Sequence, residues 1–391
     1  MRSFTIEELD QLMDMKSEPS VTVYMSSLVD KSDPNYNRTH FKNLLREVEK
    51  RLPGDYSKEY YSSKLLKPAW ELLEDSPYWN FMDQGFAMFL TPNYFQCYLL
   101  PINVQDLVTV SGHFHLKPLL ELLSQNQDFY LLTISQNGNS FYKGNIFGVQ
   151  EVKIDSMPAS MAEVLRFDVP EESVQFHTSE THRIGQGKAI YHGQGIHFSD
   201  HKKDVKRYFD EINQALHNYM KNRKAPLILA GVDWLIPVYE DANTYKNLYH
   251  EYIRGNPEEL TATDLHHKCR ELLKPIVSEA KEKAMENFNN KINSDLTSKD
   301  LEEIVASAFF GKIDTLFVRV GEQVWGTFDS QKPGITIEEG QTYENQDLLD
   351  FAAVHTHRNG GRIFPIQPEE LFEDSPVAAE FRFKAELVHV H

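Results

Sequence analysis

Short apolar runs alternate along this chain with segments whose apolar residues recur every three or four positions. Residues 129–135 and 227–230 are typical of buried strands, and between them Val205, Phe209 and Ile212 repeat at helical spacing. Apolar strands that alternate with helices indicate α/β layers with a largely parallel or mixed sheet. Because 391 residues exceed what one hydrophobic core usually supports, two or three domains are expected.

The order of the patterns favours three consecutive α/β domains, with boundaries at 1–125, 126–257 and 258–391. Two hairpins are predicted, at 86–100 and at 129–143, the second turned by Asn137-Gly138. A helix that begins at His201 and carries many lysines follows in the middle domain. The other expected helices cover 5–15, 41–51, 160–165, 263–292, 298–309 and 345–358, and the other expected strands cover 21–25, 149–154, 315–320, 362–365 and 379–383.

Two Gly-Gln-Gly triplets stand shortly before the basic helix, and the second is Gly193-Gln194-Gly195. Glycine permits close approach of another backbone, and glutamine offers an uncharged donor and acceptor. This combination suits the positioning of a water molecule or the lining of an RNA pocket, whereas classical acid–base chemistry needs a titrating group. The same pattern is also typical of a turn or a mobile linker, and this alternative stays open.

Charge is distributed unevenly. The whole chain carries a net charge of -18, yet residues 183–224 hold nine basic and four acidic residues. An acidic protein with one basic segment could contact RNA phosphates at a single place, although a solvated lysine face is the alternative. The candidate RNA-binding residues are Arg183, Lys188, Lys202, Lys203, Lys206 and Arg207.

Other signals narrow the function. No apolar run is long enough to cross a membrane and no signal core opens the chain, so a cytoplasmic protein is expected. Neither a membrane nor DNA is expected as a partner. Cys97 and Cys269 are expected to be buried or inert, and no metal ligand pattern or cofactor motif occurs. The chain also lacks the phosphate-binding motif of nucleotide hydrolases, so any GTPase would be a partner.

Several aromatic and histidine residues are expected to serve packing. Trp234 and Trp325 lie in or beside apolar segments and are predicted to pack in cores rather than stack on bases. His355 and His357 are predicted to be surface or capping residues of a late helix. His113 and His115 are expected to pack within the first domain. The histidines around the Gly-Gln-Gly motifs could add pH-dependent positive charge; they are His177, His182, His192, His197 and His201.

The order of these parts resembles the class-one translation termination factors of archaea and eukaryotes, their relative Pelota, and above all the bacterial archaeo-eukaryotic release-factor-like proteins. The middle-domain likeness rests on the 128–143 hairpin, the Gly-Gln-Gly region, the helix from His201 and the run 225–231. In the third domain it rests on 311–318, Asn359-Gly360-Gly361 and 375–383. The run 115–120, His-Leu-Lys-Pro-Leu-Leu, is similar to a segment typical of the bacterial branch.

This resemblance implies a candidate catalytic group. Termination factors carry Gly-Gly-Gln, whose glutamine helps water attack the peptidyl-tRNA ester. The equivalent here is Gln194 with Gly193 and Gly195, or else Gln186. His192 stands where the first glycine of the pair would be, and no Asn-Ile-Lys-Ser motif for stop-codon reading occurs.

The sequence therefore leads to one leading hypothesis and two alternatives. The first is a ribosome-associated factor that docks in the tRNA site against rRNA and tRNA, for rescue, recycling or dormancy, with a translational GTPase as a possible partner. One alternative is a peptidyl-tRNA ester hydrolase that uses Gln194. The other is a protein-interaction module with no ribosomal role, which the acidic remainder of the chain would suit.

Overall fold

The computed structural model describes residues 4–27, 35–75, 79, 84–124, 126–166, 194–292, 294–367, 370 and 375–383. The chain divides into two compact units: Met1–Asn126 together with Pro275–His391, and Gln127–Lys274, called the middle unit below. Both units combine helices with β-sheets, which confirms the predicted α/β class. The first unit holds separate sheets in its N-terminal and C-terminal parts, and the division into three domains stays a prediction.

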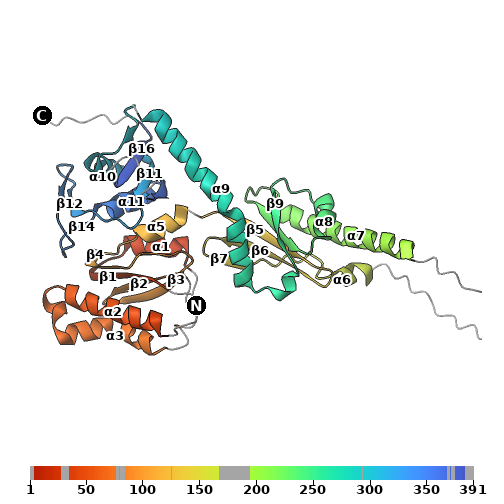
Figure 1. Ribbon diagram of the computed structural model, residues 1–391, viewed down its shortest axis with the longest axis horizontal. Helices are drawn as coiled ribbons and strands as arrows, with labels where there is room; N and C mark the ends of the chain where they lie inside the picture. Colours follow the sequence, from red (N-terminus) through yellow and green to blue (C-terminus); the bar gives the residue numbers. More distant parts are fainter. Residues whose placement is uncertain are drawn as a thin grey trace, which may run out of the picture. The chain divides into compact units, whose positions relative to one another are not determined.

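An antiparallel sheet with strand order β3-β2-β1-β4 forms the N-terminal part of the first unit. Helices α2 and α3 lie side by side against one face of it (Figure 1). The alternating residues Val21, Val23 and Met25 of β1 are fully buried beneath these helices, as period-two patterning requires. The elements are α1 (Ile6–Asp14), β1 (Lys16–Ser26), α2 (Tyr36–Arg51), α3 (Glu59–Glu74), β2 (Gly85–Thr91), β3 (Tyr94–Leu100) and β4 (Leu107–His113).

The C-terminal part of the first unit has a mixed sheet with order β10-β16-β11-β15, in which only β11 and β15 run parallel. A small antiparallel sheet, β13-β12-β14, lies in the same part. Helix α5 (Lys117–Ser124) follows β4 in sequence and packs against β15 and α11 of this part. The remaining elements are β10 (Thr297–Ser298), α10 (Leu301–Phe309), β11 (Ile313–Arg319), β12 (Trp325–Asp329), β13 (Gly334–Ile337), β14 (Gln346–Asp347), α11 (Leu348–Arg358), β15 (Arg362–Ile366) and β16 (Val377–Phe381).

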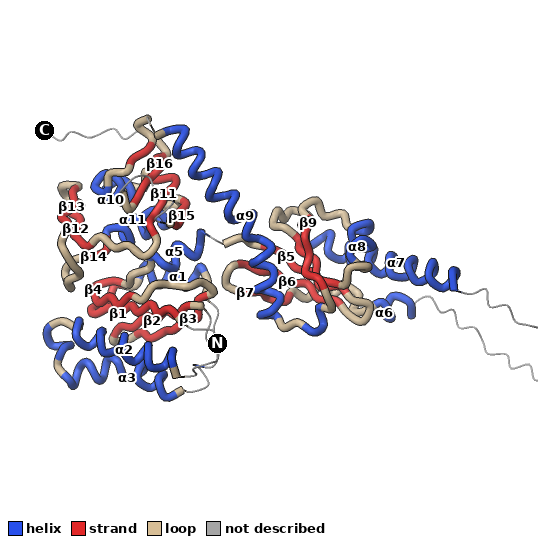
Figure 2. Tube along the Cα trace, viewed as in Figure 1, coloured by secondary structure: helices blue, strands red, loops and turns tan. Residues whose placement is uncertain are grey.

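The middle unit is built on a five-stranded sheet with order β7-β6-β5-β8-β9. Strands β5, β8 and β9 run parallel, while β6 and β7 continue as antiparallel hairpins. Figure 2 shows the strands of this unit in red and its helices α7 and α8 in blue. Helices α7 and α8 pack on one face, where they bury Tyr130, Leu132 and Ile134 of β5. The elements are β5 (Phe129–Ile134), β6 (Asn139–Asn145), β7 (Gly148–Glu151), α6 (Met161–Arg166), α7 (Gln194–Met220), β8 (Leu227–Gly231), α8 (Ile236–Ala242) and β9 (Leu248–Arg254).

A long helix, α9 (Ala262–Lys291), passes from the middle unit into the first one. Its first half is attached to the middle unit by two hydrogen bonds: His266 Nε2 lies 2.8 Å from the Asn145 carbonyl, and the Tyr249 hydroxyl donates to the Leu272 carbonyl at 2.8 Å. None of the helices in the described ranges has the length and hydrophobicity needed to cross a membrane.

The structure corrects part of the predicted element order. The two hairpins and the long helix 263–292 are confirmed within a few residues. The sequence analysis did not predict α3, β4, α5, α8, β9 or the small sheet β13-β12-β14. The N-terminal sheet is antiparallel throughout, so the expectation of parallel or mixed sheets holds only for the other two large sheets.

Candidate functional site

Helix α7 turns one face into the core of the middle unit and the other to solvent. Val205, Phe209 and Ile212 are fully buried, as the helical spacing predicts. Tyr219, further along the same helix, is only partly buried against this core. The exposed side chains on the outer side include the basic residues Lys202, Lys203, Lys206 and Arg207, called the basic face below.

Two cations of the basic face have acidic partners on the same helix. Lys206 Nζ lies 3.3 Å from Asp210 Oδ1, and Arg207 Nε lies 3.9 Å from Glu211 Oε1. All four side chains are about half exposed. Because exposed pairs at this spacing stabilise a helix by only about 0.3–0.5 kcal/mol, a phosphate could displace the carboxylates at little cost. The carboxylates nevertheless lower the positive potential that an approaching RNA would meet.

The predicted catalytic motif is described only in part. Gln194 and Gly195 are the first two residues of α7, whereas the sequence placed them in a loop and began the helix at His201. A glycine in the first turn costs a helix less than one in its interior, so the helix can start inside the motif. Gly193, Arg183 and Lys188 lie outside the described residues, and the roles of all these residues stay predictions.

A second feature lies where two parallel strands end. Gln136 follows β5 and Trp234 follows β8; since β5 and β8 are parallel neighbours, both residues lie at the carboxyl edge of the sheet. Gln136 Nε2 lies 2.7 Å from Nε2 of His201 on α7. The His201 and Trp234 ring centroids are 6.1 Å apart. Because an amide nitrogen only donates, His201 Nε2 is the acceptor in this contact. These three residues are called the carboxyl-edge cluster below.

The prediction that Trp234 packs in a core is wrong, because its side chain is 50% exposed. It lies in the turn between β8 and α8, and its neighbour Leu235 takes the buried position at 2% exposure. The carboxyl edge of parallel strands is where open α/β sheets bind ligands. An exposed indole beside an imidazole therefore offers a flat surface on which a nucleic-acid base can stack.

Metal binding was tested on the described residues. Among them, no group of three or more histidine, cysteine or carboxylate side chains is placed to hold a metal ion. His177, His182 and His192 lie outside the described residues. Burial raises the pKa of Cys97 well above its usual range and that of Cys269 to about 12, so neither thiol forms the thiolate that metal binding or nucleophilic attack needs.

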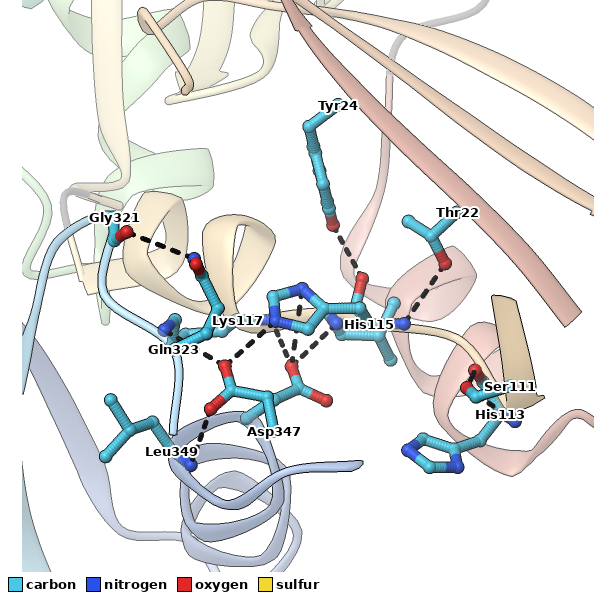
Figure 3. Close-up of polar contacts among 12 residues, drawn as sticks. Thr22, Tyr24, Ser111, His113, His115, Lys117, Gly321, Gln323, Asp347 and Leu349 are labelled. Carbon is cyan, nitrogen blue, oxygen red and sulfur yellow. Dashed lines mark hydrogen bonds and ion pairs between the residues drawn. The ribbon is translucent and has the colours of Figure 1, made fainter. Parts of the chain in front are cut away.

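Four ionisable side chains lie buried together where the N-terminal and C-terminal parts of the first unit meet, and Figure 3 labels His115, Lys117 and Asp347 among them. They are His115, Lys117, Asp347 and Asp350, called the buried charge cluster below. Asp347 Oδ2 lies 3.0 Å from His115 Nε2 and 3.2 Å from Lys117 Nζ. The Lys117 ammonium also donates to the Glu322 carbonyl.

The two carboxylates of this cluster also cap helices. Asp347 Oδ1 accepts the backbone N–H groups of Val324 and Leu349, each at 3.0 Å, and so caps α11. Asp350 Oδ1 accepts from the N–H groups of Leu116 and Lys117, at 2.7 and 2.5 Å, at the start of α5. The cluster therefore holds the N-terminal ends of two helices that come from distant parts of the sequence.

The pKa of Asp347 shows whether burial or the polar partners of this carboxylate have the larger effect. Burial alone would raise this pKa, but the Lys117 ammonium and the hydrogen bond from His115 outweigh burial and lower it to about 2. Nearby Glu121 behaves in the opposite way: burial raises its pKa to about 7, against the opposing effects of Lys117 and His115. Glu121 Oε1 is buried without a hydrogen-bond partner in the described structure. One buried site thus contains a carboxylate stabilised as the anion and another that favours the neutral form.

Sequence reasoning missed this cluster, although it quoted the run 115–120 that contains half of it. His115 was expected to pack within the first domain, but it contacts Asp347 across 232 positions of sequence. His355 was expected at the surface or in a cap, and its carbonyl accepts the N–H of the C-cap residue Asn359. The His355 ring also lies 4.2 Å from that of Phe351, and burial lowers the pKa of His355 to about 4. His357 is partly buried beside Asp10, at 3.7 Å.

Comparison with known proteins locates the likeness in the middle unit. Residues 129–275 match the bacterial archaeo-eukaryotic release factor family 7. This part of the chain is release-factor-like. The match covers nearly all of the middle unit, including α7 and the carboxyl-edge cluster, and it confirms the resemblance inferred from the sequence.

Solved structures of Pelota and Dom34 also align with the chain, at low similarity. Pelota of Archaeoglobus fulgidus is 13% identical, with 77% of this chain and 80% of that chain covered and a TM-score of 0.32. Pelota of Thermoplasma acidophilum is 9% identical, with 98% and 96% covered and a TM-score of 0.27. Dom34 of S. cerevisiae, described as a translation termination-like factor that interacts with Hbs1, is 12% identical, with 77% and 74% covered and a TM-score of 0.29. No curated protein matches. The family assignment rests on residues 129–275 alone.

Proposed function

We propose that this release-factor-like chain is a cytoplasmic, ribosome-associated factor that docks in the tRNA site during rescue, recycling or dormancy. The observation that carries the proposal is the coincidence, within the family-matched residues, of the basic face with the exposed Trp234. Both lie within the middle unit, and His201 of the carboxyl-edge cluster directly precedes Lys202 on α7. RNA binding that tolerates any base sequence combines two elements. Cations contact the phosphates, and an aromatic side chain beside them stacks on a base.

The proposal assigns these residues different parts of the binding. Lys202, Lys203, Lys206 and Arg207 contact rRNA or tRNA phosphates, which makes the affinity depend on salt. Each lost phosphate contact lowers the slope of log affinity against log salt by about 0.7–0.9. Trp234 contributes stacking, which does not depend on salt in this way. Arg183 and Lys188 are proposed to extend the phosphate contact, and a translational GTPase is a further proposed partner.

The test is co-sedimentation of the full chain with vacant bacterial ribosomes over a range of salt concentrations. We expect salt-sensitive binding that the quadruple variant Lys202→Glu, Lys203→Glu, Lys206→Glu, Arg207→Glu reduces at least a hundredfold. A matched control changes the net charge equally at exposed lysines outside the basic face, namely Lys67→Glu, Lys268→Glu, Lys274→Glu and Lys283→Glu. If the two quadruple variants bind ribosomes with equal affinity, the assignment of the basic face as the ribosome-binding surface is wrong. Absence of binding by the unchanged protein even at low salt would favour a protein-interaction module.

Peptidyl-tRNA ester hydrolysis is a second candidate, and the glycine-flanked Gln194 at the start of α7 favours it. In this candidate function Gln194 positions the attacking water molecule, and Gly193 and Gly195 allow another backbone to approach closely. Release of labelled peptide from programmed ribosomes is the assay, with Gln194→Ala as the variant that should lose release while keeping ribosome binding. His192→Gly restores the Gly-Gly-Gln order of termination factors and should raise release. Release unaffected by either change contradicts this candidate.

A further inference from the structure

A cavity of about 440 Å³ lies within the first unit, beside the buried charge cluster. Its walls come from α1, the start of β1, the end of β4, the segment that leads into α5, the end of α10, β14 and one side of α11. Helices α1, α5 and α11 lie close together (Figure 1), and hydrogen bonds join α11 to the other two. The volume is within the range of about 300–1,000 Å³ that small-molecule sites occupy.

The cavity reaches a buried carboxylate that has an oxygen to spare. Asp350 lines the cavity and is only 2% exposed. Its Oδ1 accepts the N–H groups of Leu116 and Lys117, but its Oδ2 has no hydrogen-bond partner within the described part of the chain. Asp347 differs, because both of its oxygens are bonded. Since burial of a charged oxygen is costly without a partner, a cationic group in the cavity would be stabilised beside Asp350.

Two further polar side chains lie on the walls of this cavity. Gln346 on β14 and His113 at the end of β4 are both partly exposed, and the only hydrogen bonds of His113 in the described structure are made by its backbone. Burial lowers the pKa of His113 although the Asp350 carboxylate opposes this, so the imidazole is neutral at pH 7 and does not repel a cation. A carboxylate, an amide and an imidazole together suit an ammonium group, which has three N–H donors.

An aromatic wall faces the cavity as well. The His355 ring centroid lies 4.2 Å from that of Phe351 and 5.3 Å from that of Phe309. These three side chains and that of Val354 line the cavity and are all partly exposed, so they offer apolar surface to a ligand. The lowered pKa of His355 leaves its ring neutral, and aromatic faces attract cations as well as apolar groups.

The rim of the cavity carries two exposed cations, Lys16 and Arg358. The Arg358 guanidinium is already engaged, because it donates to Asp14 Oδ1 at 3.0 Å and to the Met13 carbonyl. Lys16 forms no ion pair with a carboxylate in the described ranges. A rim lysine without a partner disfavours a polyamine, but it suits a ligand that carries a carboxylate as well as an ammonium group.

The spacing along α11 indicates how far apart those two groups must be. The charge of Lys16 lowers the pKa of His355, so Lys16 lies within electrostatic range of that residue. His355 follows Asp350 by about 7.5 Å along the helix axis, at 1.5 Å per residue. An extended peptide covers about 3.3–3.6 Å per residue, so two or three residues span this distance and a single amino acid does not.

We propose that this cavity binds a short apolar peptide with free termini, whose N-terminal ammonium group is held by Asp350. Gln346 and His113 accept further N–H groups of the ammonium. The apolar side chains of the peptide lie on the wall of Phe309 and Phe351, and its carboxylate points toward Lys16. Because hydrogen bonds already fix α11 to α1 and α5, the site is pre-formed and loses little entropy on binding.

The test is isothermal titration of the purified full chain with the tripeptide Ala-Phe-Ala at pH 7. We expect saturable one-to-one binding. N-acetylated Ala-Phe-Ala, Ala-Ala-Ala and free phenylalanine lack the ammonium, the aromatic group and the length, respectively, and each should bind at least tenfold more weakly. The experiment needs neither a ribosome nor the basic face, so its failure would leave the function proposed above untouched.

Variants of the cavity locate the peptide. Asp350→Asn keeps an oxygen for the N–H groups of α5 but replaces the other with a donor, and it should weaken Ala-Phe-Ala binding at least tenfold. Glu121→Gln makes the same chemical change at a buried carboxyl group that does not line the cavity, and it should leave binding unchanged. Gln346→Ala and Lys16→Ala, at partly or fully exposed side chains, should each weaken binding severalfold.

Three results would overturn the proposal. They are no saturation by Ala-Phe-Ala at millimolar concentration, equal binding of the acetylated and free peptides, and wild-type affinity in the cavity variants. Far-ultraviolet circular dichroism establishes whether each variant is folded. If Asp350→Asn does not fold, Gln346→Ala and Lys16→Ala decide the question, and wild-type affinity in both would be sufficient to reject the site.

Discussion

The basic face of α7 and the buried charge cluster of the first unit use the same side-chain chemistry in opposite surroundings. On α7, Lys206 and Arg207 are about half exposed and pair with acids one helical turn away. In the first unit, Lys117 and Asp347 are 1% and 0% exposed and come from positions far apart in sequence. Exposed charges can exchange their partners for a ligand, whereas a buried charge that loses its partner has nothing to replace it. The comparison separates charges available for binding from charges that hold the fold.

The largest expected effect is on stability, from Lys117→Met. Removing the ammonium leaves Asp347 buried with the His115 imidazole as the remaining side-chain partner of its Oδ2 atom. Breaking a buried pair in this way destabilises by about 3–5 kcal/mol. Urea unfolding followed by circular dichroism measures the loss. Lys67→Met, on an exposed helix face, is the control and should change stability by no more than about 0.5 kcal/mol. A loss below about 1 kcal/mol for Lys117→Met would contradict the structural role of the cluster.

The next effect is a dependence of stability on pH, caused by Glu121. Burial raises the pKa of Glu121 in the folded state from 4.5 to about 7. The contribution of Glu121 to the free energy of unfolding is therefore fully present below about pH 4.5 and is lost as pH rises through about 7. The loss at pH 8 amounts to about 3 kcal/mol. Glu121→Gln, which stays neutral, should therefore be more stable than wild type at pH 8 and similar to it at pH 4.5. Urea midpoints at both pH values measure this, and parallel pH profiles would refute it.

Asp347 provides the internal contrast, because its pKa is shifted in the other direction. Its folded pKa is lowered to about 2, so its contribution is complete above about pH 4 and is lost as pH falls through about 2. The loss of stability at low pH that Asp347 causes should be the same in Glu121→Gln as in the wild type. The two carboxyl groups of one buried region thus affect stability in different pH windows.

Local patterns predicted local structure well, and failed where the fold brings distant residues together. The hairpin at 86–100 was predictable because Thr91-Pro92-Asn93 marks a turn between two apolar runs. Strand β9 was missed because His250 and Glu251 interrupt its apolar pattern at the sheet edge. The His115–Asp347 contact joins residues 232 positions apart, and no single-sequence pattern encodes such a separation. Trp234 was assigned to the core because its neighbours are apolar, but the turn before α8 directs Leu235 inward instead.

A smaller effect is expected at the carboxyl-edge cluster. Trp234→Ala should leave stability almost unchanged, since half of the side chain is exposed. If a base stacks on the indole, RNA affinity falls by about 1–3 kcal/mol, which is about five- to 150-fold. Binding of a short single-stranded RNA, measured by fluorescence anisotropy at several salt concentrations, should show this loss without a change in salt slope. Trp325→Ala, in the first unit, is the control for losing an indole, and an equal loss of affinity in that variant would argue against stacking at Trp234.

A further small effect on stability is expected on α7. Lys206→Glu with Arg207→Glu replaces two attractive i, i+4 pairs, each worth about 0.3–0.5 kcal/mol, with repulsive pairs of similar size, so the total loss is about 1–2 kcal/mol. Lys274→Glu with Lys283→Glu disturbs similar surface pairs on α9 and should cost a similar amount. Ribosome affinity should fall only for the α7 variant, because stability is not what the basic face provides. A large loss of stability in the α7 variant would indicate that Lys206 and Arg207, like Lys117, stabilise the fold. It would contradict their assignment to a binding surface.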